Sequence, residues 1–335
     1  MIDPNALPLK HTLKPAYLLS AIVAFLLTVA SAAGLMLGST GLYGADPKIA
    51  LGVEEAEAGL LVPGLLGQDT FNLLIALPLL LGTVWFARRG SLVGLLLWPG
   101  MLFYVLYWSV LYLIGAPFSV LFLLYVSLVT LSAYALISLV ASVDGGRVRR
   151  RLAQFVPARL VGGILVVLAL LTLAQDAVGA FVTALAEGAP VDPAARHVWI
   201  SDLALQAPAV LAGGLLLFRR KALGYVAGAG LLLQYGLSAI GFVASMALQA
   251  ILAGSPLDVT TSVVLFVFGG VCFVPLALFV RGAARSQHAP RPSADAAEAE
   301  HTYPEIGRRA PGDAEPTPLE PESPVKQGIT GGREI

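Results

Sequence analysis

The sequence is short of charged residues and has a single cysteine. Only 13% of its 335 residues are Asp, Glu, Lys or Arg, whereas soluble domains carry about a quarter. The lone Cys272 excludes an intrachain disulfide and a Cys-x-x-Cys site. It lies in an apolar run, where we expect a small packed side chain. The Walker loop, the His-Glu-x-x-His helix and the Gly-x-Ser-x-Gly elbow are all missing.

Ionisable residues are also missing from the middle of every predicted span. No Lys, Arg, Glu or His lies there, although a charge at that depth would mark a functional site. The four histidines all lie outside the spans: His11, His197, His288 and His301. A haem held by paired helix histidines and an intramembrane di-metal carboxylate site both lack their ligands. We therefore expect no metal and no other cofactor.

Long apolar runs dominate what is present. The chain is 57% hydrophobic with a mean hydropathy of +0.81, and runs of about 20 apolar residues span a bilayer. The runs are continuous and do not alternate, which excludes a membrane β-barrel. We predict an all-α polytopic membrane protein with about eight transmembrane helices, at residues 16–36, 70–87, 92–114, 118–143, 160–185, 202–218, 222–252 and 260–280.

The chain divides into two membrane halves and a tail. A signal peptide would start much like the first helix, but its apolar run is longer than usual, so we expect it to be retained. The last 50 residues hold nine acids and five bases without apolar periodicity, which is typical of disorder. The predicted parts are an N-terminus (1–15), a first half (16–145), a basic linker (146–159), a second half (160–282) and a disordered tail (283–335).

The distribution of bases predicts the orientation. With the N-terminus inside and eight spans, fourteen bases before the tail lie inside, and only Lys48 and Arg196 lie outside. This asymmetry is the one that the positive-inside rule requires. We therefore predict eight spans with both termini in the cytoplasm.

Two stretches of the chain repeat one order of features. Residues 67–104 and 201–235 both read acid, apolar run with a proline, glycine, arginine pair and second apolar run. Alignment of Arg88 with Arg219 places Tyr104 on Tyr235, while the prolines miss register by one residue. We interpret this as a parallel four-plus-four internal repeat. The alternative is a coincidence between two hairpins with basic turns.

One set of acidic and histidine side chains is a candidate site. Asp69 and Asp202 start predicted helices, where an acid commonly caps free amides. Asp176 is harder to explain, because a helix interior near lipid disfavours a lone carboxylate. The alternative to capping is one outward-facing polar site of Asp69, Asp176, His197 and Asp202, able to hold a cation or move a proton.

Aromatic and amide side chains form a second set of candidates. Tyr104, Trp108 and Tyr112 recur every four residues, so they share a helix face and are candidates to line a groove. Packing and an aromatic belt at the membrane surface are the alternatives. For Gln206 and Gln234, lone polar groups within spans, we expect interhelical hydrogen bonds.

Several short motifs resemble a group of bacterial integral membrane proteins with no assigned activity. The matching pieces are Gly67–Asp69 before Leu77–Leu80, then Ala87–Ser91, Leu121–Leu128, and Asp202–Leu203 with Pro208 and Arg219–Arg220. The resemblance covers about residues 16–282 and implies a bacterial cell membrane and eight or so spans. In that group a histidine lies close before the Asp that matches Asp202. Here His197 is five residues before it.

These observations favour a multi-pass membrane protein whose partners are the lipid bilayer and a small solute or lipid. A carrier or permease is the leading interpretation, because parallel repeats recur in transporters. One alternative is a membrane-embedded enzyme with an outer-face Asp/His site, although an enzyme is the less favoured class. Another is an assembly or sensory protein whose tail recruits a cytoplasmic partner. We expect no nucleic-acid partner.

Overall fold

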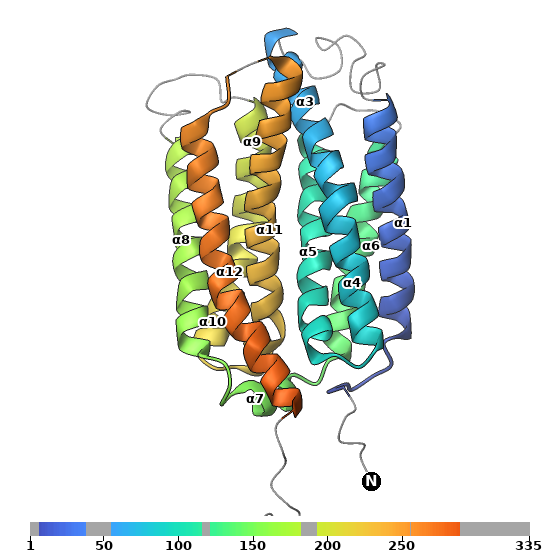
Figure 1. The fold of residues 1–335 in the computed structure, drawn as a ribbon, viewed down its shortest axis with the longest axis vertical. Coiled ribbons are helices and arrows are strands. Elements are labelled where there is room, and N and C mark those ends of the chain that lie inside the picture. Colours follow the sequence, from blue (N-terminus) through green and yellow to red (C-terminus); the bar gives the residue numbers. More distant parts are fainter. Residues whose placement is uncertain (1–6, 38–54, 116–120, 182–192, 255, 289–335) are drawn as a thin grey trace, which may run out of the picture. The chain divides into compact units, whose positions relative to one another are not determined.

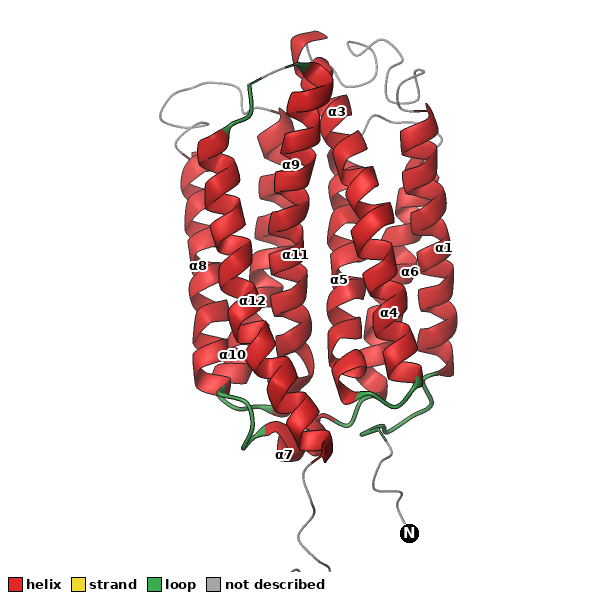
Figure 2. Ribbon diagram, viewed as in Figure 1, coloured by secondary structure: helices red, strands yellow, loops and turns green. Residues whose placement is uncertain are grey.

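The computed structural model describes residues 7–37, 55–115, 121–181, 193–254 and 256–288. Within these ranges the regular elements are helices, apart from one isolated β-bridge between Leu9 and Val143 (Figure 2). Eight helical segments are long and apolar enough to cross a membrane, and they lie side by side (Figure 1). The prediction of an all-α polytopic membrane protein with eight spans is confirmed.

Eight spans and one short helix make up the described elements. The second and sixth spans are composite, because a π-helical turn joins two α-helices in each. In chain order the elements are α1 (Lys14–Leu37), α3 (Glu55–Phe71), η2 (Asn72–Ala76), α4 (Leu77–Arg88), α5 (Leu92–Gly115), α6 (Leu121–Ser142), α7 (Gly145–Leu152), α8 (Ala158–Phe181), α9 (Pro193–Ser201), η4 (Asp202–Gln206), α10 (Ala207–Phe218), α11 (Ala222–Ala253) and α12 (Val259–His288).

Three boundaries differ from the sequence-based prediction. The second span begins at Glu55 instead of residue 70, and the sixth begins at Pro193 instead of residue 202. Asp69 and Asp202 therefore lie inside helices, and the expected capping role is wrong for both. Helix α12 continues to His288, six residues into the segment predicted as tail. Residues 289–335 lie outside the described residues, so the disorder of the tail stays a prediction.

Basic side chains gather at one end of the bundle, which we call the basic end. It carries α7, the start of α1 and the turns at residues 89–91 and 219–221 (Figure 1). Asp144 caps α7 there, because its carboxylate accepts the backbone N–H of Arg147 at 3.1 Å and lies 3.2 Å from Arg147 Nε. These contacts with Arg147 lower the pKa of Asp144.

Helices α5 and α11 form the centre of the bundle. They are the two most buried spans, and each packs against the other and against an element of the opposite half, α11 on α3 and α5 on α9. Gly100 and Gly230 meet where α5 and α11 touch. A Cβ atom on Gly230 would lie 2.7 Å from the backbone nitrogen of Gly100. Only glycine permits this approach, which brings the two halves together at the core.

A proline explains each π-helical turn. Pro78 and Pro208 lie in the first turn of α4 and α10 and have no N–H to donate to the carbonyl four residues earlier. The backbone instead bonds at a spacing of five: Leu77 N–H donates to Asn72 and Ala207 N–H donates to Asp202. Each turn carries a buried polar residue at its start. Such π turns occur frequently at functional sites.

Matching local features recur at a spacing of 130 residues. The π turns begin at Asn72 and Asp202. The residues with positive φ in the following turns are Gly90 and Arg220. This spacing differs by one from the alignment on the arginine pairs. It makes Asn72, and not Asp69, the counterpart of Asp202.

Candidate functional site

A polar cavity of about 410 Å³ lies in the second half of the chain. It is enclosed by α8, the α9–α10 span, α11 and α12, far from the basic end. Asp176 lies three residues from the end of its span at Gly179, which is about 5 Å at 1.5 Å per residue. The polar side chains that line the cavity include Thr172, Gln175, Asp176, Asp202, Gln206 and Tyr235.

Two carboxyl groups face each other at this cavity. Asp176 of α8 and Asp202 of the π turn both line it. Asp176 is 4% exposed and Asp202 is 8% exposed. Two buried negative charges at one cavity repel each other and are poorly solvated, and both effects favour a proton on the pair.

The two carboxyls differ in their other contacts. The hydroxyl of Tyr107, on α5, donates to Asp202 Oδ1 at 2.7 Å, which holds this side chain in place. In contrast, Asp176 Oδ2 is buried and has no hydrogen-bond partner among the described residues. A buried polar atom without a partner is costly. Asp176 Oδ2 therefore lacks the hydrogen bond that a buried carboxylate oxygen normally makes.

The amides and hydroxyls around the pair are mostly satisfied by each other. Gln234 Nε2 donates to Gln206 Oε1 at 2.6 Å, and the hydroxyls of Thr172 and Tyr235 lie 2.5 Å apart. The first contact links α11 to the π turn and the second links α8 to α11. The prediction that Gln206 and Gln234 make interhelical hydrogen bonds is confirmed, and they make one with each other.

A second polar cluster lies on the first-half side of the bundle, and its side chains hydrogen-bond to one another. Gln68 Nε2 donates to the hydroxyl of Tyr104 at 2.9 Å and to Asn72 Oδ1 at 3.0 Å. The Tyr104 hydroxyl also donates to Asn72, and Ser245 Oγ donates to Gln68 Oε1 at 3.1 Å. All of these groups are uncharged. This cluster therefore satisfies itself and serves packing.

The structure brings together two of the four residues of the predicted polar site. Asp176 and Asp202 pair, whereas Asp69 accepts a hydrogen bond from Tyr112 at 2.9 Å on the first-half side. The imidazole of His197 packs against Gly115 of α5 and does not line the cavity. Within the described ranges no group of three His, Cys, Asp or Glu side chains could hold a metal ion.

The predicted groove aromatics are buried in the bundle. Tyr104, Trp108 and Tyr112 are each less than a tenth exposed, and they line neither cavity described here. The Trp108 ring lies 4.6 Å from that of Phe242 on α11, and Tyr112 stacks on Tyr125 of α6. Packing accounts for all three side chains.

Sequence reasoning missed Tyr107 and did not recognise the π turns. The available signal was a polar residue six positions before a proline inside an apolar run, which occurs at Asn72–Pro78 and again at Asp202–Pro208. No family model, curated protein or solved structure matches this chain, so the site is interpreted from its own geometry.

Proposed function

We propose that this protein is a carrier for a small solute or lipid, and that the Asp176–Asp202 pair exchanges its proton for a cationic group during transport. The observation that supports this proposal most strongly is the pair itself: two buried carboxyls at a polar cavity, one with a free oxygen. Ionisable groups inside membrane spans are costly and mark ion or substrate pathways.

The chemistry of the pair favours exchange over a purely structural role. A structural polar cluster would use all of its hydrogen-bonding groups, as the first-half cluster around Gln68 and Asn72 does. The second-half pair instead leaves Asp176 Oδ2 buried and without a hydrogen-bond partner among the described residues, although Asp176 lines a cavity. A proton lost from the pair leaves two negative charges, which a cation entering the cavity would compensate.

A parallel internal repeat is part of the proposal. The π turns, the positive-φ turns and the Gly100–Gly230 contact all follow one spacing of 130 residues. Parallel repeats about an axis along the membrane normal occur in transporters. In this interpretation the two halves share an ancestor, and the acidic pair arose in the second half only.

The orientation is likewise proposed. The bases of the arginine turns and of α7 lie at one end, and the positive-inside rule assigns that end to the cytoplasm of a bacterial inner membrane. The acidic cavity would then open toward the outer leaflet. A cysteine introduced in the turn at residue 90 should resist impermeant thiol reagents added outside intact cells.

The test is proton release from reconstituted vesicles. Purified protein is placed in liposomes that enclose a pH-sensitive dye, and Na⁺, K⁺ and a series of primary amines are added outside. The proposal predicts protein-dependent proton movement with at least one of these cations. It also predicts loss of that movement in Asp176→Asn and Asp202→Asn, while Asp258→Asn, an exposed helix cap outside the cavity, retains it. Equal proton movement in all variants would contradict the proposal.

A further inference from the structure

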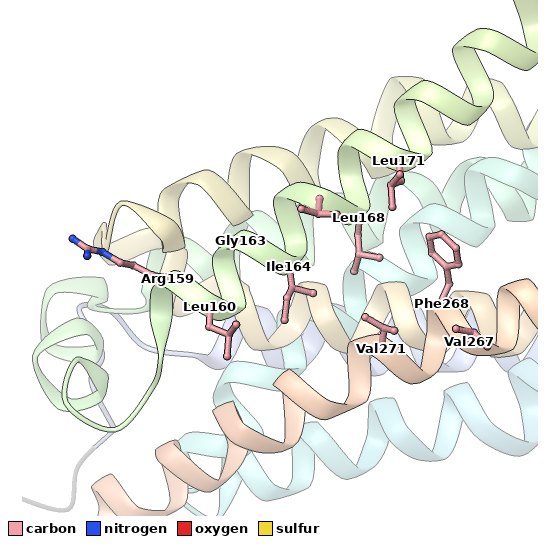
Figure 3. A pocket seen from close by; sticks show the side chains of 10 residues that line it. Arg159, Leu160, Gly163, Ile164, Leu168, Leu171, Val267, Phe268 and Val271 are labelled. Atoms are coloured by element: carbon pink, nitrogen blue, oxygen red, sulfur yellow. The ribbon is translucent and has the colours of Figure 1, made fainter.

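A second cavity lies directly beside the acidic one. It is an apolar groove of about 500 Å³ between α8 and α12, and Phe268 of α12 lines both cavities. Figure 3 shows Leu160, Ile164 and Leu168 of α8 facing α12, with Phe268 and Val271 on the other wall. The groove therefore adjoins the acidic cavity at Phe268, and its lining is apolar except for Arg159 at the far end.

The groove exists because α8 packs on α10 and not on α12. Gly162 sits against the backbone of Phe218, and a Cβ on Gly214 would lie 2.9 Å from Leu165 Cβ. These glycines draw α8 toward α10, and α8 and α12 make almost no direct contact. In the first half the corresponding helices, α1 and α6, pack side by side. The groove is thus specific to the half that carries the carboxyl pair.

The dimensions of the groove suit one hydrocarbon chain. Its lining runs along α8 from Leu160 to Leu171, a distance of about 16 Å at 1.5 Å per residue. This is about half of the roughly 30 Å hydrocarbon core of a bilayer. The carboxyl pair lies beyond one end of the groove, about 5 Å from the end of its span at 1.5 Å per residue. The groove lies mostly in the half of the span nearer the basic end, so an amphiphile with its head at the carboxyl pair would extend its chain along α8 past the middle of the bilayer.

The charge of the cavity selects the head group. Two carboxyls line it, and the basic side chain that lines the adjoining groove, Arg159, lies about 25 Å away along α8, so phosphate or carboxylate heads would be repelled from this end. The other titratable groups that face the pair are Tyr107 of α5 and Tyr235 of α11. Residues 260–268 of α12 add two threonines and apolar side chains. An ammonium head would pair with the carboxyls and donate to the free oxygen of Asp176.

We propose that the substrate is a long-chain amphiphile with a protonated amine head, which enters sideways from the bilayer between α8 and α12. This inference rests on the proposed carrier function and specifies its substrate class. The ammonium group replaces a proton bound by the Asp176–Asp202 pair. One positive charge enters and one proton leaves, so the net charge of the site is unchanged.

The inference is tested by the binding of defined amines to the full-length protein in lipid nanodiscs, measured by native mass spectrometry. Tetradecylammonium should bind more than about tenfold more tightly than butylammonium, since each buried methylene contributes about 0.8 kcal/mol. Tetradecanoate, which has a similar chain and an anionic head, should bind much more weakly. Equal binding of butylammonium or of tetradecanoate would overturn the inference.

Two matched substitutions on α12 test where the hydrocarbon chain of the ligand binds. Val271→Trp should fill the groove and weaken tetradecylammonium binding, whereas Phe266→Trp, at an exposed position outside the groove and about 140° around the helix from Val271, should leave it unchanged. Equal effects of the two would contradict lateral binding. Competition by phosphatidylethanolamine but not phosphatidylglycerol would assign the amine to a phospholipid. A lack of competition by both would assign it to a single-chain amine.

The same experiment separates this inference from the carrier function. If butylammonium binds as tightly as tetradecylammonium and drives proton movement in vesicles, the carrier stands and the amphiphile inference fails. If tetradecylammonium binds in the groove but moves no protons, the binding site stands and the carrier function fails.

Discussion

Gly100 of α5 and Gly230 of α11 touch backbone to backbone, and they are 130 residues apart in the chain. The same spacing relates the two π turns and the two positive-φ turns. In the proposed internal repeat these two glycines would be equivalent residues, and their contact would lie on a pseudo-two-fold axis between the halves. This contact joins the first half, which has the cluster around Gln68, to the second half, which has the groove and the carboxyl pair.

Substitution of either glycine should destabilise the bundle. Gly100→Ala or Gly230→Ala would push the two backbones apart, and overpacking of this kind costs about 1–3 kcal/mol or more. Thermal unfolding in mild detergent should show a lower midpoint for each variant. Gly82→Ala is the control, because nothing lies within 4 Å of its added Cβ. An unchanged midpoint for Gly100→Ala would mean that the helices do not meet there.

The hydrogen bond from Tyr107 should stabilise Asp202. Tyr107→Phe leaves a buried carboxyl with one partner fewer, and such a change within a membrane protein costs about 1–2 kcal/mol. It should also weaken tetradecylammonium binding, because Asp202 is no longer fixed. Tyr134→Phe, at a position 61% exposed, should change neither quantity. Equal behaviour of both variants would argue that the bond does not form.

The proline at the second π turn should control the site without supporting the fold. Pro208→Ala restores an N–H that can bond to Ala204, so the π turn should convert to an α turn. The inserted residue is then lost and Asp202 rotates by about 100° relative to the helix that follows it. Tetradecylammonium binding should fall strongly with little loss of stability. Pro78→Ala, at the π turn of the first half, is the matched control and should leave tetradecylammonium binding unchanged.

The cap at Asp144 should make stability depend on acid pH. Arg147 lowers the folded-state pKa of this carboxyl below its unfolded value of about 3.9. The stabilisation is therefore complete above about pH 4 and is lost as the pH falls through the lower folded pKa. Wild type should unfold at a higher temperature than Asp144→Ala between pH 5 and 7, by about the usual effect of a lost cap. A difference that persists unchanged at the lowest accessible pH would contradict this assignment.

Composition and hydropathy predicted the membrane class and the eight spans correctly, because twenty-residue apolar runs leave few alternatives. The starts of the second and sixth spans were wrong, since the helices there begin at Glu55 and Pro193 and continue through Asp69 and Asp202. The sequence analysis placed Asp176 and Asp202 in one candidate site, but it could not show that these two of the four residues come together. Pairing depends on how α8 packs against α10, and that contact is set by glycines whose effect is visible only in three dimensions.

The carboxyl pair itself is the most direct target. Dicyclohexylcarbodiimide reacts with protonated carboxyls in apolar surroundings, and peptide mass spectrometry locates the adduct. The account predicts one adduct per protein, on Asp176 or Asp202, that disappears in the double Asn variant and is suppressed by tetradecylammonium but not by butylammonium. An unlabelled cavity, or labelling that tetradecylammonium leaves unchanged, would contradict the claim that this pair holds an exchangeable proton.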